Sequence, residues 1–284
     1  MHDCSELHFI PMADVIQQLV NGQNSGDLNV QDRGLSYGHG IFETLKISAN
    51  KPLLWQSHID RLLAGCHRLK IPVDKLQEQL EKDLTLLEPV EQGVLKIIVT
   101  AGVGGRGYQL PIHPSPTRIV QLSHFPSYPD QPSNKGIKAR WCSIQLSCAP
   151  LLAGLKHLNR LEQVLAKAEW SDNDIREGIV CGSDGYLAEG TMSNLFIVKD
   201  YVLKTPILES YGVAGVMRNH LIDLACSVNI EVDVCKLTKD DLIAADEVFF
   251  CNSLIEIWPL RQLEQYAFEV GPITRKLQHL LMKE

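Results

Sequence analysis

Strand-like and helix-like apolar patterns alternate along this sequence, and one proline-rich stretch interrupts them. Branched apolar residues at 94–101 and 117–123 are typical of β-strands, whereas residues 57–71 repeat apolar side chains at helical spacing. Residues 123–136 contain three prolines and little apolar content, which is typical of a linker. The patterns predict an α/β or α+β fold with two mixed-sheet domains, a smaller one at 1–122 and a larger one at 137–284.

The second predicted domain also alternates strands and helices. Residues 157–170 form an amphipathic pattern, and Ser183-Asp184-Gly185 separates two strand-like runs, as expected for a hairpin turn. Residues 273–284 predict a final helix. The apolar face expected for the helix at 157–170 comprises Leu158, Leu161, Val164, Leu165 and Ala168.

Composition excludes several classes of protein. Twenty-seven basic against 34 acidic residues give a net charge of −7, which argues against a nucleic-acid-binding protein. The eight cysteines form no CxxC pair and have no nearby histidine cluster at zinc spacing, so no metal site is predicted. Most of them lie in apolar runs, as expected for reduced, buried thiols in the cytosol. No signal peptide or membrane-spanning run is evident, so a cytoplasmic location is expected.

A glycine-rich segment at residues 102–107 matches the GxGxxG pattern of dinucleotide-binding proteins. That motif must open a helix, and Pro111, Pro114 and Pro116 forbid one here. The sequence therefore argues against an NAD-dependent oxidoreductase and predicts a mobile loop. Arg106 in this loop is either a surface charge or a residue that grips a carboxylate.

Several other residues have ordinary structural interpretations when they are taken one at a time. Lys156 is an exposed lysine at a helix start, Glu189 is an acid at a strand end, and His39 is a structural or surface histidine. The runs 212–217 and 250–255 are plain turns, although the first leads into a helix whose free N–H groups can hold an anion.

Six motifs taken together have a more specific meaning. They are DRGLSYGHGIFETLK, HIDRL, the segment around Lys156, EGTMSNLF, YGVAGVMR and CNSLIEIWPL. In this order they resemble the fold-type IV pyridoxal-phosphate enzymes, the family related to class IV aminotransferases. The resemblance extends from about Asp32 to Pro259. It implies a two-domain fold, pyridoxal 5′-phosphate as cofactor, and a homodimer in which loops of one subunit close the cleft of the other.

The resemblance also implies roles for individual residues. Lys156 would be the Schiff-base lysine and the proton shuttle, Glu189 would face the pyridine nitrogen, and Arg61 would bind the cofactor phosphate. Further cofactor contacts are expected from Asn194, Val216, Met217, Ser253 and Leu254. Substrate contacts are expected from Arg106, Tyr108, Arg160 and His39.

Two segments resemble one subfamily in particular. GVLKIIVTAGVGGRGY and LAGLKHLNRLEQVL are similar to the 4-amino-4-deoxychorismate lyases, which release pyruvate from a small-molecule substrate to give 4-aminobenzoate for folate synthesis. Phe42 stands where D-amino-acid aminotransferases carry a tyrosine, which weakens the alternative of a D-amino-acid or branched-chain aminotransferase. A non-catalytic binding module is the third alternative.

Overall fold

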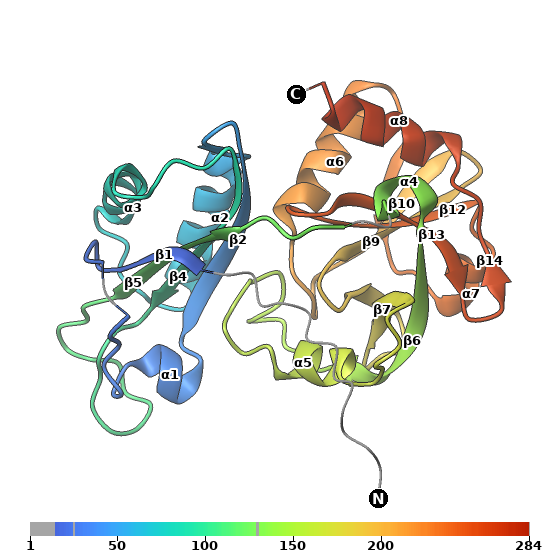
Figure 1. The fold of residues 1–284 in the computed structure, drawn as a ribbon. Helices are drawn as coiled ribbons and strands as arrows, with labels where there is room; N and C mark the ends of the chain where they lie inside the picture. The colour runs from blue at the N-terminus through green and yellow to red at the C-terminus, as the bar shows by residue number, and fades with distance from the viewer. Residues whose placement is uncertain (1–14, 25, 129–130, 284) are drawn as a thin grey trace, which may run out of the picture.

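The computed structural model describes residues 15–24, 26–128 and 131–283, which form two lobes side by side (Figure 1). Five strands of the first lobe pair antiparallel in the order β1-β5-β4-β2-β3. The elements of this lobe are β1 (Val15–Val20), α1 (Arg33–Tyr37), β2 (Gly40–Ser48), β3 (Lys51–Pro52), α2 (Trp55–Arg68), α3 (Leu76–Thr85), β4 (Gln92–Thr100) and β5 (Thr117–His124).

The first lobe forms because one apolar stripe of α2 covers one face of this sheet. Ile59, Leu62 and Cys66 of α2 are fully buried and share a core with β2 and β4. In β2, Ile41 and Leu45 point into this core, while Phe42 and Thr44 point to the opposite face. The helix and the two strands predicted for this part of the chain are all present.

The second lobe contains a nine-stranded mixed sheet in the order β11-β10-β9-β12-β13-β6-β7-β8, with β14 pairing with β13. The pairs β10–β11, β13–β6 and β6–β7 are parallel. Its strands are β6 (Ile137–Leu146), β7 (Ile175–Gly182), β8 (Leu187–Gly190), β9 (Asn194–Lys199), β10 (Val202–Pro206), β11 (Val232–Cys235), β12 (Glu247–Asn252), β13 (Glu256–Leu263) and β14 (Tyr266–Ala267). The helices are α4 (Pro132–Lys135), α5 (Leu161–Lys167), α6 (Val216–Ser227), α7 (Lys239–Ile243) and α8 (Pro272–Leu281).

Both faces of the central strands of this sheet are buried, which explains their continuous apolar runs. Phe196 of β9 and Phe249 of β12 stack at 5.0 Å in the core beneath α6 and α8. Leu195 and Phe250 point to the other face, into the core that includes α7. The predicted hairpin joins β7 to β8, and Gly185 in its turn has φ of 84°.

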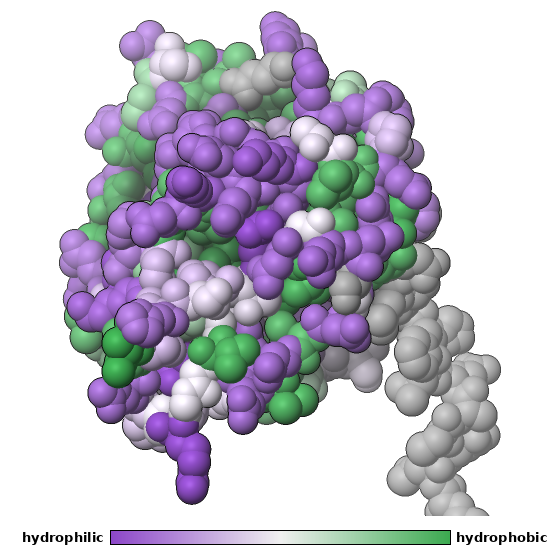
Figure 2. Space-filling view, turned by 90° about the vertical axis from the view of Figure 1, so that its left-hand side faces the viewer, coloured by the Kyte–Doolittle hydropathy of each residue, from purple (hydrophilic) through white to green (hydrophobic). Residues whose placement is uncertain are grey.

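The α/β fold class with two sheets is thus confirmed. Within the expected linker, 123–136, β5 continues to His124 and α4 forms a short helix. The limits 1–122, 123–136 and 137–284 remain our proposal for the domain division. No helix in the described part of the chain is long and apolar enough to span a bilayer. Figure 2 shows the outer face of the first lobe, where hydrophilic residues predominate and hydrophobic ones form separate areas.

The helix predicted at 157–170 differs from expectation. It spans only the seven residues of α5, and Leu161, Val164 and Leu165 are 74%, 60% and 57% exposed. Among its residues only Ala166 is buried. The apolar face of the helix therefore does not pack into the core of this chain.

Candidate active site

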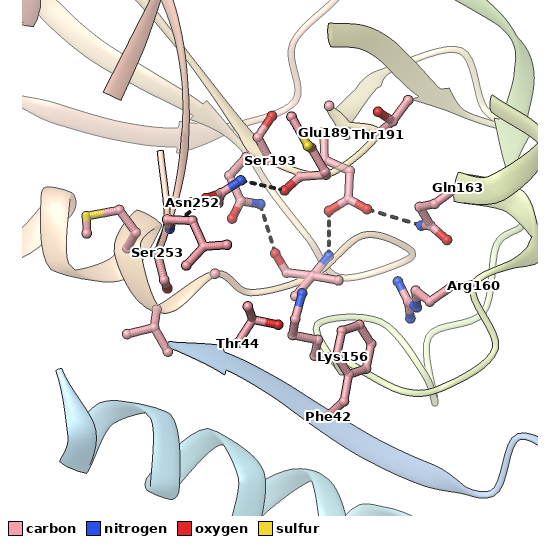
Figure 3. A pocket seen from close by; sticks show the side chains of 18 of the residues that line it. Phe42, Thr44, Lys156, Arg160, Gln163, Glu189, Thr191, Ser193, Asn252 and Ser253 are labelled. Carbon is pink, nitrogen blue, oxygen red and sulfur yellow. Dashed lines mark hydrogen bonds between the residues drawn. The ribbon is translucent and has the colours of Figure 1, made fainter. Parts of the chain in front are cut away.

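A cavity of about 340 Å³ lies where the two lobes meet, with β2 and α2 on one side and loops of the second lobe on the other (Figure 3). It brings together residues that are up to about 200 positions apart in the chain. The predicted site residues that line it are Arg61, Lys156, Arg160, Glu189, Asn194, Val216, Met217, Ser253 and Leu254.

Lys156 is held at the floor of the cavity by the backbone of β2. Its carbonyl accepts from the Phe42 amide at 2.9 Å, and its Nζ lies 4.4 Å from the centre of the Phe42 ring. Burial lowers the pKa of Lys156 to about 8, and the nearby Arg61 acts in the same direction. The neutral amine is therefore accessible near neutral pH, as a nucleophile or a proton acceptor requires.

Glu189, at the end of β8, is buried beside the same cavity. Its Oε2 accepts from the amide of Val213 at 2.8 Å, and its Oε1 accepts from Gln163 Nε2 at 3.3 Å. Burial raises the pKa of Glu189, and this is opposed by the Val213 N–H and by the nearby Arg160 and Lys156. A buried carboxylate with room for one more donor suits a protonated ring nitrogen.

The N-terminus of α6 forms another wall of the cavity. The first residues of α6 are Val216 and Met217. Backbone N–H groups in the first turn of a helix have no acceptor within the helix, so they are free to bind an anion. Gly215 precedes them, and a Cβ at this position would lie 2.0 Å from Oδ1 of Asn194. Glycine is therefore required for the close approach of Asn194, which also donates to the carbonyl of Val213.

Two side chains from different lobes face this helix terminus. Arg61 donates to the carbonyl of Ala214 at 2.9 Å, and Ser253 lies in the turn after β12. Leu254 also lines the cavity, but its amide already donates to Oδ1 of Asn252 at 2.8 Å. Ser253 lies in the same turn, with its hydroxyl 3.1 Å from Nε2 of His58.

The arrangement fits the cofactor that the sequence resemblance implies. Lys156 suits an aldehyde, Glu189 suits a pyridine nitrogen, and Arg61 with the α6 terminus suits a phosphate group. Gln163 Oε1 is buried without a hydrogen-bond partner among the described residues, which indicates that the cavity is built for a polar occupant. No group of three or more metal-ligating side chains occurs in the described part of the chain.

Arg160 lies near enough to both Lys156 and Glu189 for its charge to act on each of them. Its Nε donates to the carbonyl of His157 at 2.8 Å, and its Nη2 donates to that of Leu155 at 3.3 Å. Figure 3 shows Arg160 beside Gln163 and Phe42 on the same side of the cavity. These contacts leave the charge facing the cavity, where an anionic group of a ligand can reach it.

Three predicted substrate residues lie elsewhere in this chain. Arg106 is exposed, and Tyr108 is 86% exposed with its ring 5.5 Å from Tyr37. His39 accepts from Arg33 Nε through Nδ1 and donates from Nε2 to a backbone carbonyl, so both ring nitrogens are in use. None of the three lines the cavity. Arg33 ties the loop of Arg106 and Tyr108 to α1 through the carbonyls of residues 107 and 108.

Other cavity residues were not expected from the sequence. Gln163 follows Arg160 by three positions, and this helical spacing could have placed both side chains on one face of α5. Thr44 follows Phe42 by two positions on a strand, which places both on the same face of the sheet. No sequence spacing pointed to Asn252 as a cavity residue. Its side chain orients the turn at 253–255 by accepting from the amides of Leu254 and Ile255.

Comparison with known proteins agrees with this geometry. Residues 40–263 match the family model described as Amino-transferase class IV. The aminodeoxychorismate lyase of Vibrio harveyi is 35% identical, over 91% of this chain and 97% of that protein. A branched-chain-amino-acid aminotransferase of Salmonella typhimurium is 29% identical, over 88% of this chain and 85% of that protein.

A solved structure extends the comparison to three dimensions. The crystal structure of 4-amino-4-deoxychorismate lyase from Pseudomonas aeruginosa has a TM-score of 0.89 and 44% sequence identity, and the match covers 94% of this chain and 98% of that one. The similarity extends over both lobes and therefore over the cavity between them. The chain belongs to the class IV aminotransferase family.

Proposed function

We propose that this protein is a pyridoxal-phosphate-dependent lyase that eliminates pyruvate from 4-amino-4-deoxychorismate and releases 4-aminobenzoate, a precursor of folate. The observation that carries the proposal is the cavity in which the amine of Lys156 and the buried carboxylate of Glu189 face the same space. The similarity to lyases of Vibrio harveyi and Pseudomonas aeruginosa supports this choice of reaction.

In this proposal different residues of the cavity bind different parts of the cofactor. Lys156 holds its aldehyde end, Glu189 keeps its ring nitrogen protonated, and Arg61, Ser253 and the α6 terminus bind its phosphate. The bound cofactor supplies an aldehyde that captures the substrate amine and a ring that accepts the electrons of a breaking C–H bond. The other expected contacts, Asn194 and Leu254, shape the walls of its site.

Lys156 then acts as the proton carrier. Its Nζ takes the proton from the substrate ring carbon that bears the amine, because burial favours the neutral amine. The bond from the neighbouring ring carbon to the enolpyruvyl oxygen breaks with its electron pair going to that oxygen, and the departing enolate takes up a proton on carbon to become pyruvate. The remaining ring is aromatic, which makes the elimination favourable.

Substrate binding calls for a cation near the ring, and Arg160 is the candidate within this chain. Its guanidinium is anchored to two backbone carbonyls of the Lys156 segment, so it presents a fixed charge to a carboxylate. Arg106 and Tyr108 lie too far along the first lobe to line the cavity of their own chain. We assign them to the cavity of a second subunit, and His39 to the support of their loop.

A homodimer accounts for the exposed apolar residues. The exposed apolar residues include Leu161 and Leu165 of α5 and also Leu151, which is 86% exposed. All three lie within ten positions of Lys156 in the sequence. Covering such side chains is the usual reason for a lasting interface. A cytoplasmic location is also proposed, because the seven cysteines in the described part of the chain form no disulfide.

Incubation of the purified protein with aminodeoxychorismate tests the proposal. We expect 4-aminobenzoate and pyruvate in equal amounts with no keto acid added, and no product from the Lys156→Ala variant. An aminotransferase instead requires a keto acid to complete its cycle. If D-alanine or leucine were turned over far faster than aminodeoxychorismate, the result would contradict the lyase function and favour the aminotransferase alternative.

A further inference from the structure

Glu43 is a charged residue at a core position of β2. It lies between Ile41 and Leu45 on the face of the strand that packs against α2, and its side chain has no exposed surface. Phe42 and Thr44, its neighbours in sequence, point instead into the active-site cavity. A carboxylate among apolar side chains is costly unless it is fully paired, so its partners explain its presence.

The first partner of Glu43 is Arg61. The Nε of Arg61 donates to Oε1 at 2.7 Å and its Nη2 donates to Oε2 at 2.5 Å, a fork that fixes the plane of the guanidinium. The remaining nitrogen, Nη1, donates to the carbonyl of Ala214, just before the α6 terminus. Glu43 therefore holds Arg61 against the part of the second lobe where an anion binds.

The second partner is His58, one helical turn before Arg61 on α2. Its Nδ1 lies 2.6 Å from Oε2 of Glu43, and its Nε2 lies 3.1 Å from the hydroxyl of Ser253. Both His58 and Glu43 are buried, whereas Ser253 lines the cavity. A chain of contacts thus runs from a core carboxylate in one lobe to a cavity hydroxyl in the other.

The direction of these hydrogen bonds follows from the charges. Burial raises the pKa of Glu43, but Arg61 and His58 outweigh it and hold that pKa below its usual range, so Glu43 is an acceptor. His58 Nδ1 must therefore donate. Burial lowers the pKa of His58, with Arg61 and Lys156 acting in the same direction and Glu43 opposing them. The ring is then neutral, and its Nε2 accepts from Ser253.

We propose that Glu43 is the positioning residue of the phosphate site, holding Arg61 directly and Ser253 through His58. The inference rests on the proposed function, because it assigns the phosphate of the cofactor to this end of the cavity. Arg61 comes from the first lobe and Ser253 from the second, so one carboxylate holds the anion-binding guanidinium and the turn at Ser253 at the same end of the cavity. Preorganised side chains lose less freedom when the ligand binds, which strengthens binding.

The test compares two ligands that differ only in the phosphate. The dissociation constants of pyridoxal 5′-phosphate and of phosphate-free pyridoxal are measured by titrating the full-length chain. In Glu43→Gln we expect the constant for pyridoxal 5′-phosphate to rise by about 10-fold or more, as for other outer partners of ligand-binding groups. The constant for pyridoxal should change little, because Glu43 does not touch the rest of the cofactor.

Asp83→Asn is the matched control. Asp83 is also a buried carboxylate of the first lobe and is paired with Arg118, but it does not line the cavity. Its loss is expected to change the affinities for both ligands equally or not at all. A general weakening of the lobe by Glu43→Gln would likewise affect both ligands equally, so the ratio of the two constants separates positioning from stability.

A second pair of variants gives the answer even when Glu43→Gln does not fold. His58→Asn keeps the pair of Glu43 with Arg61 and removes only the link to Ser253. It should weaken the binding of pyridoxal 5′-phosphate in the native chain and have no further effect in the Ser253→Ala background. Equal effects in both backgrounds would overturn the link through His58.

The outcomes also separate this inference from the proposed function. A native chain that binds neither ligand refutes both. A native chain that binds pyridoxal 5′-phosphate on Lys156, with a ratio of constants that is the same in Glu43→Gln, overturns the inference alone. A ratio that shifts in Glu43→Gln but not in Asp83→Asn supports it.

Discussion

Replacing Glu189 with glutamine is the most discriminating single change in the active site, because the fold can accommodate it. The new amide can still accept from the Val213 N–H that now donates to Oε2. Its NH₂ group can donate to Oε1 of Gln163, a buried atom that has no partner among the described residues. We therefore expect Glu189→Gln to fold and to bind the cofactor.

The cost should appear in the chemical step. A carboxylate stabilises a protonated ring nitrogen electrostatically, and a neutral amide does not. The site is buried, so the interaction is only weakly screened by water. Removing a comparable preorganised partner typically slows turnover by ~100-fold or more, or about 2.7 kcal/mol of barrier.

The assay measures kcat for formation of 4-aminobenzoate at saturating cofactor, with the visible absorbance confirming that the cofactor is bound. Glu247→Gln is the control, since Glu247 is a buried carboxylate that accepts from Thr274 of α8, and neither residue lines the cavity. It should lower the stability but leave kcat of the folded enzyme unchanged. Near-normal kcat in Glu189→Gln would refute the assigned role and reduce Glu189 to an acid at a strand end.

Three further outcomes are expected. The rate at which phosphate-free pyridoxal attaches to Lys156 should rise with pH up to about 8 and then level off, because the neutral amine predominates above its lowered pKa; a rise that continues toward the usual lysine value contradicts this. Arg106→Ala should raise KM for aminodeoxychorismate with little change in kcat, at a cost of ~2–5 kcal/mol when the partner charge is buried, and an unchanged KM removes Arg106 from the substrate site. Leu165→Asp should yield monomers by light scattering, whereas Leu86→Asp, at an exposed residue of the first lobe, should not; equal masses for both variants exclude α5 from the interface.

The helix α5 illustrates where local pattern is insufficient. Its apolar residues repeat at helical spacing, and the helix forms, but Leu161, Val164 and Leu165 face outward. Periodicity identifies the apolar side of a helix and says nothing about whether that side meets its own chain or another surface.

The loop that carries Arg106 shows the same limit in another way. The sequence correctly excluded a nucleotide-binding helix after Gly107, because prolines forbid it. It could not place the loop relative to the cavity. That placement depends on Arg33, whose guanidinium donates to the carbonyls of residues 107 and 108 from more than 70 positions earlier in the chain.

By itself, the sequence determined the strands and the main helices, because these depend on patterns within short segments, and its motifs in a fixed order led to the residues proposed for the cofactor site. Lys156 and Glu189 are proposed on this basis, as parts of two of these motifs. Only the tertiary structure decided how Glu43 is used. Its partner His58 is 15 positions away in the same lobe, and His58 meets Ser253, 195 positions further along the chain, only because the two lobes pack together. Contacts of this kind depend on the relative placement of whole sheets, and no local pattern of residues records it.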